Sequence, residues 1–241
     1  MSESRRIDSI LITGASRGIG FAMACATAPM ADAIFLHART DRALDAISKR
    51  LDELAPECKQ FRVSADLADE GSPRAIADAV ATHRDQLDVL VLNGGIYLDG
   101  DAVDGASDDF LTQLRVNLLA NMDIAHCMLP LLKRGTRRRI VITGSTAGFE
   151  PYPGGAHYGI TKWGLRGFAQ NLRKELVGEN IGVTHLAAGA TATDMWADEE
   201  LPEGRLLDPD DHGILLAAVL SLSPQAVVEE ISIRSMLGDP H

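Results

Sequence analysis

The chain has 241 residues, of which 46% are hydrophobic and 24% charged, a composition typical of a globular protein with a sizeable core. Its formal net charge of −11 argues against nucleic acid as a partner, because phosphate attracts basic proteins. The three cysteines are widely spaced and fit no metal or redox motif, which favours free thiols in a reducing cytoplasm. The apolar runs are too short to span a membrane and the N-terminus lacks a signal-peptide core, so we expect a cytoplasmic protein with no metal and no membrane partner.

Strand-like and helix-like segments alternate along the chain. Apolar runs predict strands at 9–13, 33–38, 60–64, 87–92, 139–143, 182–188 and 227–233. Helices are predicted from 20 to about 28, and at 41–54, 72–84, 107–133 in two pieces, 156–177 and 209–222, with Asp41 and Ser72 as caps of the second and third. This alternation predicts one α/β domain over 1–241: a doubly wound parallel sheet of about seven strands in three layers, the Rossmann fold.

A glycine-rich stretch, T-G-A-S-R-G-I-G, follows the first strand and opens the first helix. Glycine permits the tight turn and lets the backbone approach a pyrophosphate at the helix N-terminus. The spacing is G-x-x-x-G-x-G rather than the general G-x-G-x-x-G fingerprint, and a purely structural turn is the alternative. Its place in the first βαβ unit favours a dinucleotide site, with contacts from Gly14, Ser16, Arg17, Gly18, Ile19 and Gly20.

The end of the second strand indicates which dinucleotide binds. An acid there would bind the adenosine ribose and repel a 2′-phosphate, but the strand ends His37-Ala38-Arg39. Arg39 can pair with that phosphate, and we expect Arg17 to point toward the same region. The alternative is that Arg39 is a solvated residue at the start of a helix. The charge pattern therefore predicts NADP(H) in preference to NAD(H).

Tyr158 and Lys162 lie four positions apart in a predicted helix, so they share one face. A lysine cation one turn away is expected to lower the tyrosine pKa and create a general acid/base near neutral pH. Ser145, at the end of the fifth strand, is placed to hold a carbonyl oxygen. The alternative for this Y-x-x-x-K pattern is an ordinary surface helix.

Together these motifs resemble the classical short-chain dehydrogenase/reductase family, from Ser9 to about Ile233. Asp66-Leu67 is similar to the family's adenine-contacting pair, and Asn93-Gly94-Gly95 to its N-A-G turn. Asn117 resembles the catalytic asparagine, which holds a water linked to the lysine. Residues 188–193 resemble the family's P-G-x-x-x-T segment beside the nicotinamide, with Ala188 in place of proline and Gly189, Thr191 and Thr193 retained.

The resemblance implies an NADP(H)-dependent oxidoreductase that interconverts a carbonyl compound and an alcohol. Tyr158 would be the general acid/base, Lys162 would bind the nicotinamide ribose, Ser145 would hold the oxygen and Asn117 would feed a proton relay. It also implies a homodimer or homotetramer that pairs through helices 107–133 and 156–177.

The substrate pocket is less readable from the sequence. Ser145 and Tyr158 would meet the reacting group, and Phe149, Tyr152, Met195 and Trp196 suggest an apolar or aromatic ligand, unless these side chains only pack. The acidic segment 194–207 reads equally as a mobile lid or a solvated connection. Two other functions stay open: an NAD-dependent alcohol dehydrogenase, and a non-catalytic dinucleotide-binding sensor or scaffold. Substrate identity is not encoded in any motif.

Overall fold

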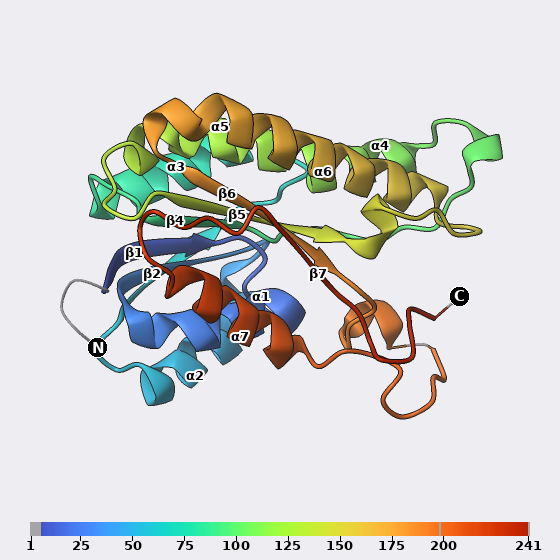
Figure 1. Cartoon of the computed structure of the whole chain (residues 1–241), viewed down its shortest axis with the longest axis horizontal. Coiled ribbons are helices and arrows are strands. Elements are labelled where there is room, and N and C mark those ends of the chain that lie inside the picture. The colour runs from blue at the N-terminus through green and yellow to red at the C-terminus, as the bar shows by residue number, and fades with distance from the viewer. Residues whose placement is uncertain (1–5, 198, 241) are drawn as a thin grey trace.

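Seven parallel strands form one sheet in the order β3-β2-β1-β4-β5-β6-β7 (Figure 1). The computed structural model describes residues 6–197 and 199–240. The strands are β1 (Ile7–Ile12), β2 (Ala31–Ala38), β3 (Lys59–Ser64), β4 (Val89–Leu92), β5 (Arg139–Ser145), β6 (Gly182–Ala188) and β7 (Glu230–Ile233). The predicted doubly wound parallel sheet is confirmed.

Helices cover both faces of the sheet. In Figure 1, α3 (Ser72–His83), α4 (Asp108–Leu114), α5 (Ala120–Leu132) and α6 (Ala156–Leu176) lie on one side, and α1 (Gly18–Thr27), α2 (Asp45–Leu54) and α7 (Pro209–Leu220) on the other. Alternate strand residues enter the two cores. Leu11 of β1 packs into the core under α3, α5 and α6, whereas Ile10 and Ile12 pack into the core under α1, α2 and α7. This is why the strands read as continuous apolar runs.

The helix starts differ from the sequence prediction. Asp41 does not cap α2, because its carboxylate accepts a hydrogen bond from Arg62 at 2.9 Å and it begins a short 3-10 turn. Gly71 takes the N-cap position of α3, and the Ser72 hydroxyl donates to the Asp66 carbonyl instead. Both predicted caps are wrong because tertiary partners take up the side chains.

The long helical region after β4 is continuous but changes its winding. A π-helical turn over Arg115–Leu119 joins α4 to α5. Such turns carry an extra residue per turn and often mark functional sites. The turn contains Asn117, which is fully buried.

None of the helices in the described part of the chain combines the length and apolar character needed to cross a bilayer.

The carboxyl ends of β1 and β4 meet at the centre of the sheet. The next strand in the chain after β1 lies on one side and the strand after β4 on the other. Ligands bind at such a switch point in open α/β sheets. The fold therefore brings the glycine-rich stretch and the loop after β4 to one edge.

Helix α7 is anchored to the segment after β6 by a buried histidine. The Nε2 atom of His212 lies 2.9 Å from the Thr191 hydroxyl, which in turn donates to the Gly189 carbonyl at 2.8 Å. His212 has no exposed surface, and burial lowers its pKa to about 4. The side chain is therefore neutral in the folded protein down to a low pH.

This burial makes stability depend on pH. An unfolded histidine, with a pKa of about 6.5, binds a proton before the folded one does, so stability present at neutral pH is lost as the pH falls from about 6.5 toward 4. His212→Gln cannot titrate, and should reduce the slope of unfolding free energy against pH in that window by up to about 1.4 kcal/mol per pH unit. Urea unfolding at several pH values measures both slopes, and equal slopes would contradict the assignment.

Candidate functional site

The glycine-rich turn leaves the N-terminus of α1 open. Gly14 and Gly18 adopt φ of 66° and 55°, the left-handed region that favours glycine. A Cβ on Gly14 would lie 2.9 Å from the Gly94 Cα, so the two loops touch. In the described structure the first turn of α1 has neither a side-chain cap nor an acidic residue. Its unshared N–H groups therefore suit an anionic pyrophosphate.

The turn after β4 is joined to β1 by hydrogen bonds. The Asn93 side chain donates to the carbonyls of Thr13 and Gly14 at 3.1 and 3.3 Å. Leu67 is 7% exposed and lies directly against Gly94. Leu67 is therefore a core residue below this turn, whereas Asp66 is half-buried and accepts from the Ala68 amide.

The two arginines predicted to meet a 2′-phosphate have different surroundings. Arg39 is exposed at the end of β2, where Ala38 leaves no acid. Arg17 instead donates to the Asp194 carboxylate at 2.5 Å. Arg17 thus faces Asp194 in this structure, and its place beside Arg39 at the 2′-phosphate stays a prediction. Both partners are mostly exposed, at 74% and 65%, so this ion pair is weak.

Asn117 and Lys162 are brought together beneath the loop after β4. The Asn117 Oδ1 accepts from the Ile96 amide at 2.8 Å, and its Nδ2 donates to the Ile96 carbonyl at 2.9 Å and to the Thr161 hydroxyl at 3.2 Å. A Cβ on Gly95 would lie 3.1 Å from Asn117 Oδ1 and 3.8 Å from Lys162 Nζ. The asparagine and the lysine therefore share one buried corner.

Tyr158, Lys162 and Ser145 converge at the carboxyl end of β5. The Lys162 Nζ lies 5.3 Å from the centre of the Tyr158 ring and donates to the Thr143 carbonyl at 3.5 Å. The Ser145 hydroxyl accepts from the Ala147 amide at 3.1 Å, and it also hydrogen-bonds to Tyr158. The spacing thus predicted a true cluster rather than a surface helix.

Burial governs the pKa values of this cluster. Desolvation raises the pKa of Tyr158 to about 12, while the hydrogen bond with Ser145 acts in the opposite direction. Desolvation also lowers the pKa of Lys162 to about 8. The expected lowering of the tyrosine pKa toward neutrality is therefore wrong for the protein alone, because removing the phenolate from water costs more than its neighbours return.

Sequence reasoning missed how the loop after β4 is held. Gln113 is fully buried; its Oε1 accepts from the Leu98 amide at 2.8 Å and its Nε2 donates to the Leu98 carbonyl at 3.4 Å. Asn117 does the same for Ile96. Tyr97 lies between them and meets the Tyr158 ring edge-on, with centroids 5.3 Å apart. A glutamine one turn before Asn117 was a detectable signal.

The residues predicted to lie beside the nicotinamide and the substrate differ in their exposure and in their contacts. The methyl group of Thr193 faces Gly18, 2.9 Å from where a Cβ there would lie, whereas Thr191 is buried against His212. Phe149 packs under Arg166, whose guanidinium carbon lies 3.8 Å from the ring centre, which supports a packing role. Met195 and Trp196 lie on a short turn, with Met195 46% exposed.

The segment after that turn is held at its end, Leu207, by backbone hydrogen bonds to residues 190 and 192. The Leu207 amide donates to the Ala190 carbonyl at 2.8 Å, and the Ala192 amide donates to the Leu207 carbonyl at 2.9 Å. Arg205 also donates to the carbonyls of Leu237 and Asp239. Asp198, part of the predicted acidic run, lies outside the described residues.

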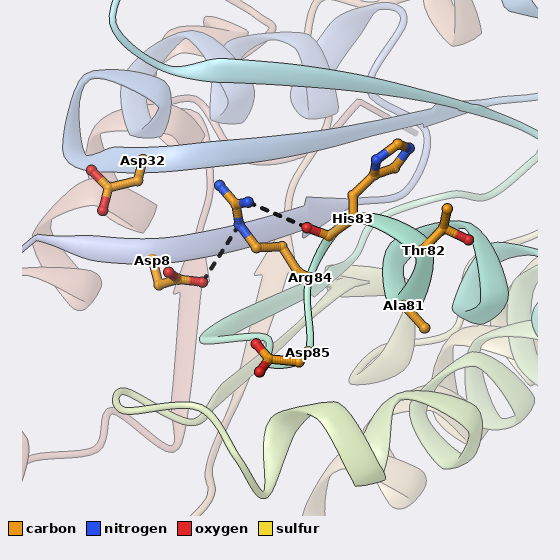
Figure 2. Close-up of a pocket in the computed structure, with 7 residues that line it drawn as sticks. All are labelled: Asp8, Asp32, Ala81, Thr82, His83, Arg84 and Asp85. Atoms are coloured by element: carbon orange, nitrogen blue, oxygen red, sulfur yellow. Dashed lines mark hydrogen bonds and ion pairs between the residues drawn. The ribbon is translucent and has the colours of Figure 1, made fainter.

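An open hollow of about 600 Å³ lies at the opposite edge of the sheet (Figure 2). It is lined by Asp8, Asp32 and residues 81–85. Asp8 and Asp32 are near the amino ends of β1 and β2, and Arg84 pairs with Asp8 at 3.8 Å. None of the predicted cofactor or catalytic residues lines this hollow, so the candidate site is distinct from it.

Comparisons with known proteins agree with this geometry. Residues 8–204 match the family model described as short chain dehydrogenase. An NADP-dependent 3-hydroxy acid dehydrogenase of Schizosaccharomyces pombe is 33% identical, covering 92% of this chain and 90% of the relative.

Two solved structures share the fold at modest identity. An alcohol dehydrogenase from Thermococcus sibiricus complexed with 5-hydroxy-NADP is 27% identical, with a TM-score of 0.87 over 97% of this chain and 99% of that one. A 3-oxoacyl-[acyl-carrier protein] reductase from Brucella melitensis in complex with NAD is 26% identical, with a TM-score of 0.84 over 95% and 96%. The chain belongs to the short-chain dehydrogenase family of oxidoreductases and has the fold of its dinucleotide-binding members.

Proposed function

We propose that this oxidoreductase uses NADP(H) to interconvert a ketone or aldehyde and the corresponding alcohol. The observation that carries the proposal is the convergence of Ser145, Tyr158, Lys162 and Asn117 beside the open N-terminus of α1. A non-catalytic sensor or scaffold would need the dinucleotide site alone, without a half-buried tyrosine beside a buried lysine.

The residues present fit a dinucleotide. The turn from Gly14 to Gly20 and the N–H groups of α1 would hold the pyrophosphate, and Thr193 borders the same crevice at Gly18. When bound, the dinucleotide supplies the hydride. Lys162 would hold its nicotinamide ribose, as the family resemblance implies.

The protein's own part in the reaction is the proton. Tyr158, whose pKa is about 12, is protonated at neutral pH, so it can donate to a carbonyl oxygen during reduction. Ser145 would hold that oxygen in place. Oxidation needs the phenolate, which the Lys162 cation favours. Asn117 would connect the lysine to a proton relay.

The preference for NADP(H) rests on the exposed end of β2. Arg39 has its guanidinium at the surface, and Arg42 follows in the same exposed segment. Neither faces an acid at the strand end, since Ala38 stands there. The relative named as NADP-dependent supports this preference, and the neighbour solved with NAD is the reason to test it.

Cofactor choice should change with the charge of residue 39. NADPH should bind more tightly than NADH, because a guanidinium pairs with the 2′-phosphate. Arg39→Asp should weaken NADPH binding and spare or improve NADH binding. Fluorescence titration with both cofactors measures the two dissociation constants, and a wild type that prefers NADH, or a mutant that keeps the NADPH preference, would refute the assignment.

Removing the phenol should stop catalysis while sparing the fold. Tyr158→Phe deletes one oxygen, so folding and NADPH binding should survive, but carbonyl reduction should fall at least about 10²-fold. A panel of ketones and aldehydes followed through NADPH consumption gives the rates, with circular dichroism as the control for folding. A folded mutant of near wild-type rate would sink the mechanism.

Lys162→Ala and Ser145→Ala distinguish the role of the lysine cation from that of the serine that would hold the substrate oxygen. Without the cation, phenolate is less favoured, so the active limb of the oxidation rate should move to higher pH, and cofactor binding should weaken. Ser145→Ala should lower the rate and also move that limb to higher pH, because the Ser145 hydrogen bond lowers the pKa of Tyr158, but it should leave cofactor binding unchanged. Cofactor titrations together with pH–rate profiles of both purified variants distinguish these outcomes.

Assembly is the next part of the proposal. Helices α4 to α6 present Leu111, Leu119, Met122, Ile160 and Trp163, each more than a third exposed. Apolar surface of this kind is expected to be covered by a second copy. We expect a homodimer or homotetramer with no nucleic-acid or membrane partner, and a monomeric mass by light scattering at micromolar concentration would contradict it.

The cysteines support a cytoplasmic location. Cys25, Cys58 and Cys127 are all free thiols. Burial raises the pKa of each, and that of Cys58 to about 11, so they are poor nucleophiles at neutral pH. Free thiols, one buried and two half-buried, suit a reducing compartment.

A further inference from the structure

All three tyrosines of the chain gather at the candidate site. The sequence contains only Tyr97, Tyr152 and Tyr158, and they come from the loop after β4, the loop after β5 and α6. Tyr97 and Tyr158 meet edge-on with ring centroids 5.3 Å apart, and Tyr152 hydrogen-bonds to Tyr97. The proposed mechanism uses one of these hydroxyl groups and leaves two without a role.

The two additional tyrosines are held by built contacts. The backbone on either side of Tyr97 is fixed by Asn117 and Gln113, each of which binds both the amide and the carbonyl of one neighbour. Tyr152 packs flat on Gly155, where a Cβ would lie only 2.0 Å from a ring atom. Glycine at 155 therefore makes room for this ring.

His157 fixes the rest of the same loop onto α6. Its backbone amide donates to the Gly100 carbonyl at 3.2 Å, and its Nε2 lies 3.1 Å from the Gly105 carbonyl. The imidazole is 3% exposed, and a Cβ on Gly100 would lie 1.9 Å from its Nδ1. The loop that carries Tyr97 and Asp99 is thus anchored at both ends.

The charge of this tyrosine group comes from Asp99. Burial raises the pKa of Tyr97, and hydrogen bonding to Asp99 and Tyr152 raises it further. Burial likewise raises the pKa of Tyr152 to about 12. Both phenols are therefore neutral donors and acceptors at physiological pH. Asp99 is exposed, so part of its carboxylate remains open to a ligand.

Two arginines in the described part of the chain, Arg17 and Arg234, already have anionic partners. Arg17 pairs with Asp194, and Arg234 pairs with Glu150 at 3.2 Å and with Asp239 at 3.4 Å. Lys162 is buried and belongs to the cofactor side in the proposed function. Among the described residues, the group formed by Tyr97, Tyr152 and Asp99 therefore offers a carboxylate and two phenols and contains no basic side chain.

We propose that Tyr97, Tyr152 and Asp99 select an uncharged carbonyl compound that carries a hydroxyl group, and disfavour one that carries a carboxylate. A substrate hydroxyl can donate to Asp99 and accept from a phenol, so both partners stay satisfied. A substrate carboxylate would meet the Asp99 charge and be repelled. This inference rests on the proposed function, since it names the substrate class of the same site.

A matched set of three ketones tests the selection. 4-Hydroxy-2-butanone, 2-pentanone and acetoacetate share a methyl ketone and differ in a terminal hydroxyl, methyl or carboxylate group. With NADPH, kcat/KM should be highest for the hydroxyketone and at least about tenfold lower for acetoacetate, as expected for one charged hydrogen bond gained or one repulsion incurred. Equal or better use of acetoacetate would overturn the inference.

Variants assign the effect to residues. Asp99→Asn keeps the size of the side chain and removes its charge, so the ratio of kcat/KM for hydroxyketone over acetoacetate should fall about tenfold. Tyr97→Phe should reduce the preference for hydroxyketone over 2-pentanone. Asp101→Asn, an exposed residue two positions away in the same loop, removes the same charge and should leave both ratios within about twofold. Ratios in Asp99→Asn that match the wild type would overturn the inference.

The same data separate this inference from the proposed function. If the enzyme reduces other carbonyl compounds with NADPH but shows no preference for the hydroxyketone, or uses none of the three, the selection fails and the proposed function stands. If the folded protein reduces no carbonyl compound at all, the proposed function fails and the selection fails with it.

Discussion

One buried hydroxyl joins the two turns on which the site depends, those that follow β1 and β4. Thr13 has no exposed surface, and its Oγ1 accepts from the amides of Asn93 and Gly94, both at 2.9 Å. These bonds join the end of β1 to the end of β4, the point from which the chain adds later strands on opposite sides of the sheet. The dinucleotide turn follows one strand and the tyrosine-bearing loop follows the other, so both loops start from a common fixed point.

Within this frame, solvent exclusion and charge act against each other. Tyr158 and Lys162 are each pushed toward their neutral forms, the phenol by a raised pKa and the ammonium by a lowered one. Burial therefore disfavours both the phenolate and the ammonium ion. In the proposed reaction the substrate oxygen would exchange the proton with Tyr158, and a cationic dinucleotide would favour the phenolate, because the net effect of the protein around Tyr158 is to raise its pKa.

The sequence predicted those features of the fold and the site that depend on local patterns. Apolar runs located the strands, and the four-residue spacing placed Tyr158 and Lys162 on one face. It did not predict features that depend on distant partners: Arg17 meets Asp194, which is 177 positions away, and Phe149 is covered by Arg166. The capping role of Asp41 failed for the same reason, since Arg62 comes from a neighbouring strand. The residue type at a position indicates which bonds its side chain can form, whereas the fold determines which partner lies next to it.

The paired amides of Asn117 and Gln113 have a consequence for binding energetics. Each satisfies both backbone groups of one loop residue, so four polar groups of Ile96 and Leu98 are ordered before any ligand arrives. Fixing one residue's backbone costs roughly 1–2 kcal/mol of conformational entropy, and here folding has already met that cost. A ligand that contacts this loop therefore meets a pre-organised surface, and more of its contact energy remains available as affinity.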